Sequence, residues 1–159
     1  MATLIDSSSR VVARRLRQGL GALALGLFAG SAWAGTLAEV WKDPNCGCCS
    51  AWVEHLEAAG FETRTHASHD MAAVKAGHDV PVELASCHTA VIDGYVIEGH
   101  VPAADIRRLL ETRPDVAGLA VPGMPHGSPG METGRFDDYA VYAWTDAGET
   151  RIVNRYIHD

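Results

Sequence analysis

The chain has 159 residues and a formal net charge of −7 at pH 7. This acidic balance argues against nucleic acid or an anionic membrane as a partner, and it suits a protein that attracts cations. The length accommodates one domain with a core of ordinary size after a leader segment.

Residues 1–34 have the pattern of a cleaved secretory signal peptide. Four arginines precede an apolar run, residues 20–29, which is shorter than the ~20 residues that a membrane span needs. Ala32 and Ala34 then supply the small residues of a cleavage site. We therefore predict export to the periplasm with cleavage after Ala34, which leaves one domain at residues 35–159 and no membrane attachment. Removing the four arginines and Asp6 changes the formal net charge from −7 to −10.

Three of the four cysteines, Cys46, Cys48 and Cys49, lie within four residues between a predicted strand and a predicted helix. A Cys-x-x-Cys pair at such a junction is typical of redox sites, because the free N–H groups and the dipole of the first helical turn stabilise a thiolate. If the site is redox-active, Cys46 and Cys49 are its reactive pair. The additional Cys48 does not belong to that pattern and indicates a metal site. A framework of two structural disulfides is the other interpretation of four cysteines in an exported domain.

The predicted elements follow in the order strand, helix, strand, short helix, hairpin and helix. They cover residues 37–42, 49–59, 61–66, 70–76, 90–97 and 102–113. The first helix places Cys49 on its buried face and turns Cys48 away from it. The hairpin is the clearest local signal, since Asp93-Gly94 is a preferred two-residue turn between two β-rich runs. Cys87 and His88 lie at the entry of this hairpin.

This order of elements is that of the thioredoxin fold, a three-layer α/β/α arrangement. In that fold the segment before the third core strand returns beside the Cys-x-x-Cys loop, so we expect Cys87 and His88 to approach the clustered cysteines. Thioredoxins carry a cis-proline at this place, whereas this chain has Cys87-His88-Thr89. Ligand side chains there favour metal binding over the docking of substrate thiols.

Residues 121–131 are predicted to form a loop, because three prolines and three glycines suit neither a helix nor an inner strand. Met124 and Met131 lie in this loop, which has no apolar periodicity that would place them in a core. Ligation of a soft metal by their thioethers is therefore an alternative to simple packing. Residues 139–145 and 151–156 are predicted to form a closing β-hairpin that fastens the loop over the site.

Four stretches of the chain, residues 41–49, 84–90, 93–102 and 121–131 without His126, resemble the CopG-type family of periplasmic copper-resistance proteins. The first two carry the Cys46-Gly47-Cys48-Cys49 and Cys87-His88 motifs. The resemblance spans nearly the whole predicted mature chain, and it implies an exported thioredoxin-like domain that binds copper and serves in copper resistance or homeostasis. It also implies metal ligands, which are Cys46, Cys48, Cys49 and Cys87 with His88, Met124 and Met131 in addition. Whether His100 and His126 are ligands stays open.

The chemistry of these residues favours the same metal. Thiolate, thioether and imidazole form a soft ligand set, which selects Cu(I) over harder divalent ions. One Zn²⁺ would leave four thiolates at a net charge of −2, whereas several Cu(I) ions with bridging thiolates bring a buried cluster close to neutrality. We therefore predict a polynuclear Cu(I)-thiolate site.

Several functions fit such a site. We favour a periplasmic copper-binding protein whose partners are copper ions and other copper-handling proteins of that compartment. A thiol-disulfide oxidoreductase is the alternative, and a structural zinc module is a third candidate that leaves the methionine loop unexplained. The sequence leaves open copper oxidoreductase activity, and whether the copper is stored, transferred or oxidised.

Overall fold

The computed structural model describes residues 35–158, so the predicted signal segment 1–34 lies outside the described residues. The strands are β1 (Leu37–Lys42), β2 (Glu62–Ala67), β3 (His88–Ile92), β4 (Tyr95–Gly99), β5 (Gly118–Val121), β6 (Tyr139–Trp144) and β7 (Thr150–Tyr156). The helices are α1 (Gly47–Ala58), α2 (Met71–Gly77) and α3 (Ala103–Thr112), with the 3₁₀ turn η1 (Val82–Leu84) before β3. None of these helices is long and apolar enough to cross a membrane. The predicted α/β class is confirmed.

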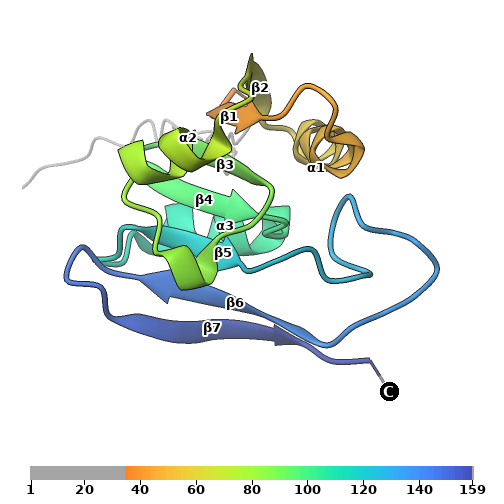
Figure 1. Cartoon of the computed structure of the whole chain (residues 1–159). Helices are drawn as coiled ribbons and strands as arrows, with labels where there is room; N and C mark the ends of the chain where they lie inside the picture. The colour runs from red at the N-terminus through yellow and green to blue at the C-terminus, as the bar shows by residue number, and fades with distance from the viewer. Residues whose placement is uncertain (1–34, 159) are drawn as a thin grey trace, which may run out of the picture. The chain divides into compact units, whose positions relative to one another are not determined.

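All strands of this described part join one sheet in the order β2-β1-β3-β4-β5-β6-β7 (Figure 1). β1 pairs with β2, and β4 with β5, in parallel, whereas the other neighbours are antiparallel. β3 therefore lies next to β1, the strand that leads into the cysteine motif. This topology brings the two cysteine-bearing segments to one end of the sheet.

The two faces of the sheet are covered differently. One face packs against α1 and α3 in the main hydrophobic core, in which Trp52, Leu56 and Ile106 are fully buried. The other face carries a smaller apolar cluster of Leu84, Ala120 and Trp144. Leu84 belongs to η1, so the segment that precedes Cys87 is packed onto the sheet.

Local chemistry explains the elements that carry the site. The Cys46 side chain caps α1 by accepting a hydrogen bond from the Cys49 N–H at 3.3 Å. The β3–β4 hairpin turns at Asp93 and Gly94 with φ of 50° and 87°, the positive angles that a tight two-residue turn requires. The hairpin turn agrees with the prediction, whereas α1 begins at Gly47, two residues before the predicted start, because Cys46 caps it.

The sequence does not predict β5. The pattern predicts Val121 in the loop, but this residue ends β5, a four-residue strand that is buried along its whole length. A strand between two others and covered on both faces shows no polar alternation, so the periodicity rule misses it. The loop itself lies between β5 and β6. Beyond it, β6 and β7 form an antiparallel hairpin close to the predicted positions.

Candidate metal centre

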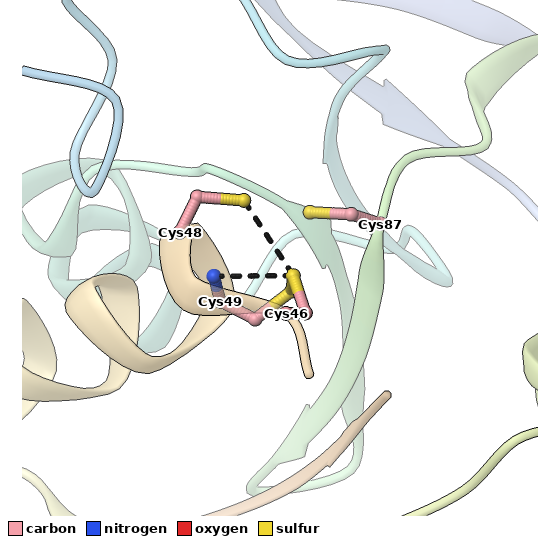
Figure 2. Close-up of side chains that lie close together, drawn as sticks. All are labelled: Cys46, Cys48, Cys49 and Cys87. Atoms are coloured by element: carbon pink, nitrogen blue, oxygen red, sulfur yellow. Dashed lines mark hydrogen bonds between the residues drawn. A yellow bond between two sulfur atoms is a disulfide. The ribbon is translucent and has the colours of Figure 1, made fainter. Parts of the chain in front are cut away.

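Antiparallel pairing of β1 with β3 assembles the site. His88, the first residue of β3, pairs with Lys42, the last residue of β1. The chain leaves Lys42 through a short loop and enters α1 at the cysteine motif, so Cys87 comes to lie beside that motif. Figure 2 shows the Cys87 side chain pointing from the β3 side towards Cys48 and Cys46. The sulfur atoms of all four cysteines lie within 4.8 Å of one another.

The cysteines are not all free. Cys46 and Cys49 are joined by a disulfide, while Cys48 and Cys87 are free thiols. The Cys48 sulfur lies 3.5 Å from that of Cys46. The four-thiolate set expected from the sequence therefore requires reduction of the Cys46–Cys49 bridge by two electrons. In the oxidised state the two remaining thiols face each other across the site.

Two histidines contact Cys87. Its sulfur lies 3.2 Å from His88 Nδ1 and 3.0 Å from His100 Nε2, and the three side chains form a second group with metal-ligand spacing. His100 Nδ1 lies 2.8 Å from the Pro129 carbonyl oxygen, which can only accept, so Nδ1 carries the ring proton. Nε2 is therefore the unprotonated nitrogen, and its lone pair points at Cys87. This is the tautomer that a metal ligand needs.

Burial keeps these groups in uncharged forms. It holds the pKa of His88 well below its usual value, with His100 and Lys75 adding repulsion. It also lowers the pKa of His100, although the Pro129 carbonyl opposes the shift. Burial, and secondly the neighbouring Cys48, raise the pKa of the Cys87 thiol to about 12. At neutral pH the imidazoles are thus free to bind a metal, and Cys87 keeps its proton unless a metal displaces it.

His100 is the site residue that the sequence left undecided. It is fully buried, and it enters the site from the end of β4. The hairpin register could have placed it. Thr89 pairs with Glu98, so continuing the same register by two residues brings Cys87 opposite His100. A two-residue turn fixes that register from the sequence alone.

The Pro/Gly loop, the segment predicted at residues 121–131, contacts the site at two places. At Gly130 a Cβ atom would lie 2.6 Å from the Cys48 carbonyl oxygen, so this part of the loop touches the first turn of α1. Met131 follows directly and is half-buried. Gly123 forms an isolated bridge with Ser86, and the adjacent Met124 is 52% exposed. The structure thus brings the backbone beside each predicted methionine ligand to the segments that carry the cysteines.

His126 has a different place. Its Nδ1 atom lies 2.7 Å from the Thr133 hydroxyl, within the same loop. This contact occupies one of the two ring nitrogens in organising the loop. The structure therefore offers no observation that favours His126 as a ligand over His100.

This chain is similar to one described protein family and to two solved structures. Residues 84–131, which include Cys87, His100 and the Pro/Gly loop, match a family described as protein of unknown function, DUF411. Two solved structures named copper resistance protein CopG, Form 2 and Form 1, are each 52% identical to this chain. Form 2 aligns with a TM-score of 0.74 over 77% of this chain and 99% of its own, and Form 1 with 0.73 over 76% and 97%. No curated protein was found to be similar.

Proposed function

Because this chain belongs to the CopG family of copper resistance proteins, we propose that it binds copper at the junction of α1 and β3. The observation that carries the proposal is the convergence of four cysteine sulfurs within 4.8 Å, with two buried imidazoles on the same thiol. Soft sulfur donors with imidazole suit copper. The relatives carry copper resistance in their names, and the same role in resistance or homeostasis is proposed for this chain.

The bound ion in this proposal is Cu(I), held by bridging thiolates in a site with several ions. Cys46, Cys48, Cys49 and Cys87 supply the sulfurs once the Cys46–Cys49 bridge is reduced. Several Cu(I) ions would balance the charge of these thiolates, which a single divalent ion would not do. His88 and His100 are additional donors, and Met131 is better placed than the more exposed Met124 to supply a thioether.

The proposal includes a thioredoxin-like scaffold and a periplasmic location. The order β2-β1-β3-β4, with α1 connecting β1 to β2 and α3 following β4, supports such a scaffold with β5, β6 and β7 as an extension. The signal pattern of residues 1–34 supports export. Fractionation of cells that express the full chain, with mass spectrometry of the mature N-terminus, tests this point, and cleavage after Ala34 is the expected result.

A second function has its own observation. The Cys46–Cys49 disulfide caps a helix N-terminus, with the Cys48 thiol 3.5 Å from Cys46. A Cys-x-x-Cys disulfide in this place suits thiol-disulfide exchange. Reductase or isomerase activity on a scrambled disulfide substrate would then survive Cys48→Ser and vanish with Cys46→Ser.

Anaerobic copper loading tests the primary proposal. The exported protein is reduced, loaded with Cu(I) and desalted, and bound copper is counted by elemental analysis. More than one copper per chain is the expected result, and Cys48→Ser should lower the count because it removes a bridging sulfur. A count of zero for the unmodified protein would sink the proposal.

The thioether contribution is tested separately. Met131→Leu should weaken Cu(I) retention against a competing chelator, because leucine fills a similar volume without a sulfur atom. Met71→Leu is the matched control, since Met71 lies in α2, outside the Pro/Gly loop and the cysteine segments. Equal retention in both variants would remove Met131 from the ligand set.

A further inference from the structure

A fully buried carboxylate lies on β4 behind the cysteine site. Glu98 has no exposed surface. One of its oxygens, Oε1, accepts hydrogen bonds from Lys75 Nζ and from the Ser86 backbone N–H, each at 2.6 Å. The other, Oε2, accepts from the Thr89 hydroxyl at 2.7 Å. Three donors around one carboxylate offset the cost of burying its charge.

Two of these donors lie next to predicted metal ligands in the chain. Ser86 and Thr89 immediately flank the Cys87-His88 pair. One carboxylate therefore holds both ends of the segment that presents the Cys87 sulfur and the His88 ring. Lys75, which also donates to the Thr89 hydroxyl at 3.1 Å, fixes the carboxylate from α2.

Ser86 is held from two further sides. A Cβ atom at Gly99 would lie 2.4 Å from the Ser86 Cβ, so only glycine lets Ser86 pack this closely onto β4. The Ser86 hydroxyl donates to the Gly123 carbonyl oxygen, which connects the same residue to the Pro/Gly loop. Ser86 thus has little freedom to move, and this fixes the backbone position of Cys87, the next residue in the chain.

We propose that Glu98 is the positioning residue of this metal site: by binding the Ser86 N–H and the Thr89 hydroxyl, its carboxylate fixes where Cys87 and His88 present their donor atoms. The inference rests on the proposed copper-binding function for its consequence. The placement of the Cys87 thiol can nevertheless be measured without copper. Glu98 acts through its neighbours on the chain.

The chain offers a matched control for a buried carboxylate. Asp105 on α3 is only 3% exposed and accepts hydrogen bonds from Asn154 Nδ2 at 2.8 Å and the Tyr156 hydroxyl at 2.5 Å. These partners belong to β7, so Asp105 fastens the C-terminal hairpin. Its loss should cost stability without moving Cys87.

The first measurement is alkylation by iodoacetamide of the protein with the Cys46–Cys49 disulfide intact. Cys48 and Cys87 are then the free thiols, and peptide mass spectrometry reads the rate at each. Glu98→Ala should raise the rate at Cys87 several-fold relative to Cys48, because the flanking hydrogen bonds are gone. Glu98→Gln should stay close to the unmodified protein, since its amide oxygen can still accept from Ser86. Asp105→Ala should leave the ratio unchanged.

The second measurement is Cu(I) affinity of the reduced protein by chelator competition. Glu98→Ala should weaken binding by roughly 10- to 100-fold, the range found when a residue that orients metal ligands is removed, and Glu98→Gln should restore most of it. If the unmodified protein binds no copper, the proposed function fails, while the alkylation ratio still decides the role of Glu98.

An unchanged alkylation ratio in Glu98→Ala would overturn the inference. So would an equal change in Asp105→Ala, which would show a global effect, or a Glu98→Gln variant as impaired as Glu98→Ala, which would show that charge rather than placement matters. If Glu98→Ala does not fold, Thr89→Val replaces it. This variant removes the hydroxyl bonds to Glu98 and from Lys75 but keeps the bond from the Ser86 N–H to Glu98, so the ratio should shift in the same direction by less, and no shift would overturn the inference.

Discussion

Two buried carboxylates stabilise two different regions of this protein. Glu98 and Asp105 are both almost inaccessible to solvent, and each accepts hydrogen bonds from side chains distant in sequence. Glu98 holds the segment that carries Cys87, whereas Asp105 holds β7 against α3. Burial of a charge by itself therefore does not mark a functional site. The role of each carboxylate depends on which segment of the chain it holds in place.

The largest expected effect comes from two glycines in the sheet, of which Gly99 lies beside Ser86 in the Glu98 region and Gly118 lies between β4 and β6, away from Ser86. A Cβ at Gly118, at the start of β5, would lie 2.0 Å from the Val96 carbonyl oxygen, and one at Gly99 would lie 2.6 Å from the Val121 carbonyl oxygen. Backbone atoms in a sheet cannot give way easily, so Gly118→Ala and Gly99→Ala should each lower the free energy of unfolding by about 3 kcal/mol or more. Urea titration measures the loss.

The same pair separates the Cys87 segment from the neighbouring part of the sheet. Gly99→Ala also pushes against Ser86, so it should raise Cys87 alkylation relative to Cys48 at a urea concentration where both variants are folded. Gly118→Ala should leave that ratio unchanged. A change of the same size in both variants would mean that any strain in the sheet, and not the contact with Ser86, exposes Cys87.

Asp105→Ala has the next largest effect. It leaves the Tyr156 hydroxyl and the Asn154 amide without their acceptor in a partly buried place, which should cost about 2–3 kcal/mol of stability. Copper loading of the folded protein should not change. Glu39→Gln is the control, because Glu39 pairs with Arg64 at the surface and surface pairs contribute little. A loss no larger than in this control would contradict the anchoring role of Asp105.

The smallest effect is a pH dependence that belongs to the hairpin region. Burial, followed by the hydrogen bond to Asp105, raises the pKa of Tyr156, and burial raises the pKa of Tyr139 to about 12. The folded protein therefore keeps these protons above roughly pH 10, where tyrosines of the unfolded chain lose theirs, so stability should fall as the pH rises past that value.

Tyrosine variants check the sign of this dependence. Tyr156→Phe should make the decline above about pH 10 shallower. The total loss of unfolding free energy over this range should be smaller by roughly 1 kcal/mol or less, because the residue is partly exposed. Tyr139→Phe should act in the same direction. Free energies of unfolding measured by urea titration at several alkaline pH values compare the slopes, and slopes parallel to that of the unmodified protein would contradict the assignment.

Much of the fold was accessible to sequence reasoning because its signals are local. The predicted strand 37–42 has the same bounds as β1, and the Asp93-Gly94 turn defines the β3–β4 hairpin. β5 was missed because a short strand buried on both faces has no polar alternation. The approach of Cys87 to the other cysteines followed from the order of elements, and the structure places it there.

Other features of the site depend on contacts between elements. His100 follows from the hairpin register, but its proton position depends on Pro129, which lies on a loop far along the chain. Glu98 looks in the sequence like an ordinary strand residue that could face solvent. Its burial becomes visible only when α2 and the segment before β3 pack on that face of the sheet.

The sequence by itself determined the clustering of Cys46, Cys48 and Cys49 at a helix N-terminus, because neighbours within a few residues set a turn, a cap and a helical face. The tertiary structure decided which groups complete the cluster. It brought Cys87 to the other cysteines, directed His100 at Cys87, and placed Glu98 behind that thiol. These outcomes depend on strand register and on the packing of both sheet faces, which are properties of the whole domain.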